Sequence, residues 1–137
     1  MPPPSRCAVN RIAIIAIALT ATANTAATQS VSPMRGIVKS FDDQFAVRLT
    51  VGNPYTKAVN FDVRVYDENF APVNAVIYPS SMKVGAGDTR QATVKVSFNG
   101  QAQRKIRVCA EGLFGKEQTN LVRTQVCGRF LGLRLGY

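Results

Sequence analysis

Apolar and polar residues alternate along much of this chain, which is the period-two pattern of strands with one buried face. The alternation is clear in four runs, in which every second residue is apolar. These apolar residues are Phe45, Val47, Leu49 and Val51 in the first run, Val59, Phe61, Val63 and Val65 in the second, Ala92, Val94, Val96 and Phe98 in the third, and Ile106, Val108 and Ala110 in the fourth. We expect each run to be a strand and the apolar residues to share one core.

Turn residues separate these runs, and weaker elements lie between and around them. The expected turns contain Pro, which supplies no donor, or Gly and Asn, which tolerate positive φ. They are Asn53-Pro54, Asp67-Glu68-Asn69, Gly85-Ala86-Gly87-Asp88 and Asn99-Gly100. An earlier strand is expected over Val31–Lys39, and Val73–Pro79 suits an edge strand or a crossing loop. Glu111–Asn120 is expected to be a long polar loop, after which a last strand begins at Leu121.

The N-terminal segment has the pattern of a secretory signal peptide. Arg6 and Arg11 precede the apolar run 12–19, and small residues follow it. The run is about half the ~20 residues that a membrane span needs, so an uncleaved anchor is the weaker alternative. Cleavage after Ala23 or Ala27 fits the small-residue rule. We therefore expect an exported, periplasmic protein.

The resulting division is a leader over residues 1–27 and one domain over residues 28–137. About seven short strands, frequent turn signals and no helical periodicity predict that this domain is all-β. The expected architecture is an immunoglobulin-like antiparallel β-sandwich. A small barrel is the main alternative.

Charge and composition narrow the function. The whole chain has 17 Lys and Arg against 8 Asp and Glu; without the leader, 15 and 8 remain, a net charge of +7. Such a charge favours an anionic partner, but export and the scatter of basic residues along the strands argue against nucleic acid. The chain has no His, and the adjacent carboxylates Asp42-Asp43 and Asp67-Glu68 fit turns. We therefore expect no catalytic residues, no metal, no cofactor and no small-molecule substrate.

Two cysteines remain after the leader, which carries Cys7 away. Cys109 and Cys127 are expected to form a disulfide in an oxidising compartment, and closing the loop would stabilise the fold by about 3 kcal/mol. Two buried free thiols are the alternative. Both cysteines share the parity of the polar residues on their strands, so the bridge should join the last two strands from the outer face of the sheet.

The end of the last strand carries an alternating apolar stripe formed by Leu131, Leu133, Leu135 and Tyr137. If the strand continues without a bulge, this stripe lies on the outer face. An exposed apolar stripe marks a partner site, and an extended strand of this kind suits β-strand addition. The alternative is a β-bulge at Gly128, which would turn the leucines into the core.

Several short segments resemble, in order and spacing, the N-terminal domain of PapD-like periplasmic pilus chaperones. The segments are Ser32-Pro33-Met34-Arg35, Leu49-Thr50-Val51-Gly52-Asn53-Pro54, Val63-Arg64-Val65-Tyr66-Asp67-Glu68, Pro79-Ser80-Ser81, Gly85-Ala86-Gly87 and Arg107-Val108-Cys109. The resemblance covers roughly residues 31–130. Such chaperones have two domains with the subunit cleft between them, and the resemblance extends over one.

The resemblance implies that two basic residues grip the C-terminal carboxylate of a pilus subunit. Arg35 stands at the position of the first. The second is a Lys in the family; this chain has none there, and Arg129 or Arg134 could replace it, because a guanidinium binds a carboxylate bidentately.

These patterns together predict a non-enzymatic periplasmic protein that binds or assembles another envelope or appendage protein, or further copies of itself. The setting would be a pilus or flagellum, with the protein as a chaperone-like or structural accessory. The predicted partner-binding residues are Arg35, Arg129, Leu131, Leu133, Arg134, Leu135 and Tyr137. The alternative is a basic envelope module that binds an anionic polymer or lipid surface, such as peptidoglycan or lipopolysaccharide.

Overall fold

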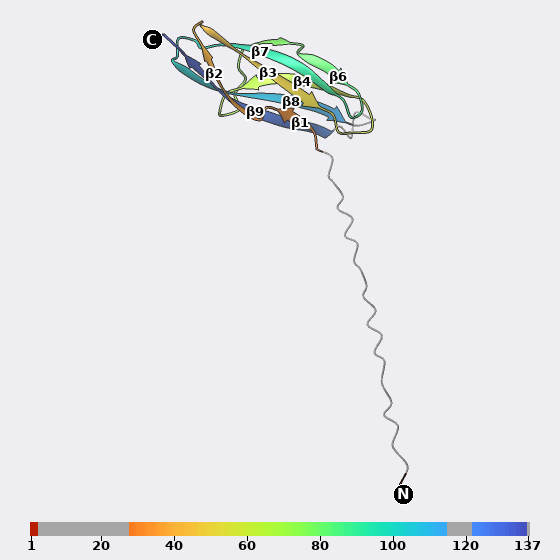
Figure 1. Ribbon diagram of the computed structural model, residues 1–137. Helices are drawn as coiled ribbons and strands as arrows, with labels where there is room; N and C mark the ends of the chain where they lie inside the picture. Colours follow the sequence, from red (N-terminus) through yellow and green to blue (C-terminus); the bar gives the residue numbers. More distant parts are fainter. Residues whose placement is uncertain (3–27, 115–121, 137) are drawn as a thin grey trace.

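Two β-sheets pack face to face in a computed structural model that describes residues 1–2, 28–114 and 122–136 (Figure 1). The strands of the described residues are β1 Ser30–Ser32, β2 Arg35–Ser40, β3 Gln44–Gly52, β4 Val59–Tyr66, β5 Val76–Tyr78, β6 Ser81–Val84, β7 Thr89–Ser97, β8 Gln103–Phe114 and β9 Val122–Arg134. One sheet has the order β1-β3-β7-β5 and the other β2-β9-β8-β4-β6. The predicted immunoglobulin-like sandwich is therefore confirmed, and the closed barrel is not formed. The predicted leader falls almost wholly outside the described residues.

The core lies between the two sheets and consists of the alternating apolar residues. β3 and β7 pair in register so that Phe45 faces Val96 and Val47 faces Val94, and all four are buried. Phe61, fully buried on β4, belongs to the opposite sheet. Burial of each large apolar side chain contributes about 1.5–3 kcal/mol, so the period-two pattern supplies the main stabilisation of the sandwich.

The predicted first strand, Val31–Lys39, is divided between the two sheets. β1 pairs with β3, whereas β2 pairs in parallel with β9. Pro33 lies between them and has no N–H for a ladder hydrogen bond, so one continuous strand is excluded. The chain thus crosses from one sheet to the other, and the β2–β9 pair departs from the predicted antiparallel arrangement.

Other boundaries also differ from the prediction. The expected polar loop over Glu111–Asn120 is wrong for residues 111–114, which belong to β8 and pair with β9 as far as Val122. The rest of the expected loop, and Leu121, lie outside the described residues. Val73–Pro79 contains the edge strand β5, as expected. β6 was not predicted, and the predicted first strand is divided into β1 and β2, so the structure has nine strands in its described part instead of about seven.

Candidate partner-binding surface

The last strand, β9, is regular from end to end. Its pairing with β8 keeps one register from Phe114 opposite Val122 to Gln103 opposite Leu133. A bulge at Gly128 would break this register, so that alternative is wrong. Leu131, Leu133 and Leu135 are half-buried, and the first two lie on the outer face opposite Lys105 and Gln103. Tyr137 lies outside the described residues.

The second half of β9, residues 129–134, which we call the leucine half, is hydrogen-bonded on both sides. β2 pairs with it in parallel, so that Ile37 lies beside Leu131 and Lys39 beside Leu133, while β8 occupies the other side. A partner strand could join the main chain here only by displacing β2. The leucines therefore present side chains, and not a free strand edge.

The first half of β9 does have a free edge. Among the described residues, no strand pairs with Val122–Gly128 on the side away from β8, because the pairing with β2 begins at Arg129. The N–H of Arg129 donates to the carbonyl of Met34 (2.8 Å), and that of Leu135 donates to Ser40 (2.8 Å). Main-chain groups alternate in direction along a strand, so those of residues 123, 125 and 127 point to the open side.

Arg35 and Arg129 lie where this free edge ends. They are register partners on β2 and β9, and Arg129 is in turn opposite Arg107 on β8. Three arginines thus form one row across three neighbouring strands, which we call the arginine row. Arg107 was not among the residues predicted from the sequence. The signal was available, because pairing Cys109 with Cys127 fixes the register that places residue 107 opposite residue 129.

A groove of about 600 Å³ lies over the arginine row. Its lining includes the three arginines, Lys105, Glu68, and the apolar residues Ile37, Phe130 and Leu131. The Glu68 carboxylate lies 3.3 Å from the Lys105 ammonium, so one negative group offsets one of four positive groups. Like charges directly opposed across strands repel one another, so the groove is an anion-attracting surface with an apolar wall.

Arg134 lies apart from the groove. Its guanidinium forms an ion pair with Asp43, and its strand position has the parity of the core residue Phe130. Arg35 has Arg129 as its direct neighbour instead. Of the two predicted substitutes for the family's Lys, the geometry therefore favours Arg129.

The disulfide is confirmed. Cys109 and Cys127 are directly opposed on β8 and β9, and their sulfurs are bonded at 2.05 Å. The bridge lies on the outer face of the sheet, as parity predicted, but Cys109 is fully buried. The long side chain of Arg64, its register neighbour on β4, lies on the same face.

A buried carboxylate lies beside the disulfide. Glu111 is 7% exposed and accepts hydrogen bonds from the Tyr66 hydroxyl (2.6 Å) and the Gln125 amide (3.0 Å). Arg64 and Arg123 are its ion-pair partners at 3.5 and 3.7 Å. The hydrogen bond to Glu111 raises the pKa of Tyr66, and burial and the negative charge of Glu111 act in the same direction. This cluster holds the side chains of two residues on the free edge of β9.

The described residues contain no group of three His, Cys, Asp or Glu side chains that could hold a metal ion. No helix in the part of the chain that the structure describes is long and apolar enough to cross a membrane.

No family model and no curated protein matches the chain. Solved structures do match. The E. coli chaperone DraB is 13% identical with a TM-score of 0.62, covering 79% of this chain and 55% of its own. The SafB chaperone complex with the SafA pilin of Salmonella enterica is 14% identical with the same TM-score and coverage. SSP-19, an MSP-domain-like protein of Caenorhabditis elegans, is 8% identical with a TM-score of 0.56, covering 76% of this chain and 98% of its own.

These matches show the fold. The chain shares the immunoglobulin-like sandwich of the matched chaperones, the fold that was predicted from the sequence, and it spans about half the length of those chaperones.

Proposed function

We propose that this protein is a periplasmic, chaperone-like assembly protein that binds a subunit of a cell-surface appendage, such as a pilus, without catalysing a reaction. The observation that carries the proposal is the free edge of β9 over Val122–Gly128, which ends at the paired Arg35 and Arg129. The likeness of its fold to pilus chaperones supports the same role.

The free edge supplies main-chain groups for an added strand. A partner strand that pairs there extends the β2-β9-β8-β4-β6 sheet and gains main-chain hydrogen bonds along its length. The Gln29 side chain, which donates to the carbonyl of Ala110 (2.9 Å) and accepts from Thr124 (2.6 Å), closes the core beneath this edge. Within the described residues no strand pairs with this edge, so its main-chain groups can bind an added strand.

The two arginines set the direction of the partner strand. They lie at the C-terminal end of the free edge, so a strand whose terminal carboxylate reaches them must run parallel to β9. Neither arginine has an ion pair within residues 28–114 and 122–136. A carboxylate bound bidentately by guanidinium groups forms charge-assisted hydrogen bonds, which are about twice as strong as neutral ones.

Co-expression with candidate appendage subunits in the periplasm tests the proposal. We expect a one-to-one complex to co-purify with the wild-type protein and to be lost from the double variant Arg35→Gln/Arg129→Gln. Arg48→Gln removes a similar charge from the outer face of β3 and should leave the complex intact. Failure of every subunit to co-purify, or survival of the complex in the double variant, would contradict the proposal.

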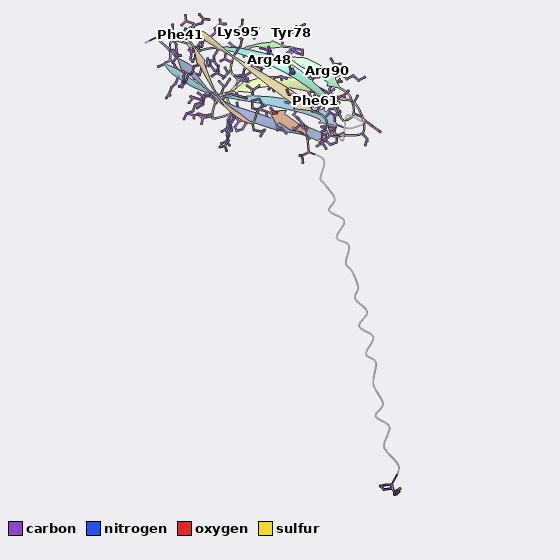
Figure 2. All side chains as sticks on the ribbon, viewed as in Figure 1. Phe41, Arg48, Phe61, Tyr78, Arg90 and Lys95 are labelled. Atoms are coloured by element: carbon purple, nitrogen blue, oxygen red, sulfur yellow. A yellow bond between two sulfur atoms is a disulfide. The ribbon has the colours of Figure 1, made fainter. Side chains whose placement is uncertain are left out.

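A second candidate function rests on the opposite sheet. Arg48, Arg90 and Lys95 are exposed on β3 and β7, where Figure 2 labels them. Such a basic face would suit an anionic envelope polymer or lipid surface. Cosedimentation with peptidoglycan or with anionic vesicles would then fall steeply as salt rises and would be lost from Arg48→Gln/Lys95→Gln, whereas subunit binding would not.

A further inference from the structure

A single terminal carboxylate bound at Arg35 and Arg129 would leave Arg107, the third member of the arginine row, unused. Neighbouring strands lie about 4.8 Å apart, so the three arginines span roughly two such spacings, on the order of 10 Å. One carboxylate is too small to engage both ends of that row. Within the described residues, no carboxylate pairs with Arg107.

The contacts of Arg107 hold its guanidinium in place without neutralising it. The group lies 4.5 Å from the centre of the Phe70 ring, and one terminal nitrogen donates to the main-chain carbonyl of Glu68 (3.2 Å). Its Nε is buried and has no hydrogen-bond partner. A buried donor without a partner is uncommon in folded proteins, and a charge fixed in advance binds an anion with less loss of side-chain freedom.

We propose that the arginine row binds two carboxylates of one partner strand: the terminal carboxylate at Arg35 and Arg129, and the side chain of a C-terminal acidic residue at Arg107. The inference rests on the proposed function and adds a preference for the partner's last residue. The apolar wall of Ile37 and Leu131 flanks the row and shields these contacts from water, which strengthens them.

Three synthetic peptides test this preference by fluorescence anisotropy. They share a sequence of alternating Val and Thr and end in Asp with a free carboxylate, in Asn with a free carboxylate, or in Asp amide. The wild-type protein should bind the first about tenfold more tightly than the second, the difference expected for one additional charge-assisted hydrogen bond. Failure of the first peptide to bind, or equal affinity for the first two, overturns the inference.

Variants assign the effect to Arg107. Arg107→Gln should bind the first two peptides equally and retain the wild-type affinity for the second. Lys83→Gln, which removes an exposed positive charge from β6 at the far edge of the same sheet, is the control and should keep the tenfold preference. If Arg107→Gln lowers the melting temperature, Arg107→Lys, which keeps the charge but not the planar fork, should show a smaller preference than the wild type. A preference unchanged in Arg107→Gln, or reduced equally by Lys83→Gln, overturns the inference.

The same experiment separates this inference from the proposed function. If Arg35→Gln and Arg129→Gln abolish binding of both free-acid peptides while Arg107→Gln changes nothing, the strand-binding role stands and the second carboxylate site is wrong. If no variant of the arginine row affects the complex with an appendage subunit, both are wrong.

Discussion

Cys109 and Cys127 face each other across β8 and β9, with Cα atoms 4.0 Å apart, and their disulfide closes a loop with a sequence separation of 18 residues. The same register places Arg107 opposite Arg129, the residue at which the pairing of β9 with β2 begins and its free edge ends. The bridge therefore supports both the stability of the sheet and the geometry of the candidate site.

Removal of this bridge should lower stability substantially. We expect Cys109→Ser/Cys127→Ser to reduce the free energy of unfolding by about 3 kcal/mol, because the unfolded chain regains the freedom of the closed loop. Urea unfolding measures the change. The denatured, unreduced wild-type domain should show no free thiol, and two free thiols would contradict the bridge.

The sequence predicted the layers of this fold because each core strand repeats the same parity. Phe45 and Val47, for example, are buried where the alternation placed them. It did not predict the transfer of β2 to the other sheet, since that depends on the local effect of Pro33 and on a non-local pairing with Arg129. The partner at each edge of a strand is set by topology, which alternation alone does not contain.

The sequence predicted only part of the candidate site, again because alternation does not determine which strands pair. Arg35 and Arg129 were named from a resemblance, and the register now places them side by side. Leu131 and Leu133 were placed on the correct face, but their main chain was expected to be open to a partner strand. The pairing with β2 closes that segment and leaves the open edge nearer to Val122, a location that no periodicity indicates.

Close packing against Gly132 gives a second stability prediction. A Cβ at this position would lie 2.6–2.8 Å from three ring atoms of Phe45, and Phe45 is buried in the core. Gly132→Ala should therefore destabilise the domain by about 1–3 kcal/mol, the usual range for overpacking. In combination with Phe45→Leu, the alanine should be better tolerated than it is alone, so the two changes should not be additive. Additive losses in urea unfolding would contradict this contact.

The hydrogen bond between Tyr66 and Glu111 predicts how stability changes in alkali. The pKa of Tyr66 is raised above its ordinary value of about 10. The unfolded chain therefore loses the Tyr66 proton at a lower pH than the folded chain does. The stabilisation from the Tyr66–Glu111 hydrogen bond is full below about pH 10 and is lost as the pH rises through the folded pKa. Urea unfolding from about pH 9 to 11.5 should show a fall in stability that is shallower in Tyr66→Phe.

Tyrosinate absorbance provides an independent check, because it reports tyrosines without interference from lysines. In the folded protein, part of the tyrosinate absorbance should appear at a higher pH than in the urea-unfolded protein, and Tyr66→Phe should remove that part. Tyr78→Phe, at a side chain that is 80% exposed, serves as the control for loss of a tyrosine. Equal effects of Tyr66→Phe and Tyr78→Phe would contradict the role assigned to Glu111.

Substitutions in the two halves of β9 should weaken partner binding to different extents. The N–H of Arg123 points away from β8, so Arg123→Pro removes no ladder hydrogen bond but blocks a donor that an added strand would use. Partner-subunit binding should fall at least tenfold, the effect of losing about one hydrogen bond and the close approach of the partner strand. Arg123→Gln, which loses the weak ion pair with Glu111 but keeps the N–H, should bind normally.

Leu133 lies in the half of β9 that already pairs with β2, so Leu133→Ser should weaken partner binding less than Arg123→Pro. If serine at 133 abolishes binding and proline at 123 does not, the partner uses the leucine half of the strand, with β2 displaced.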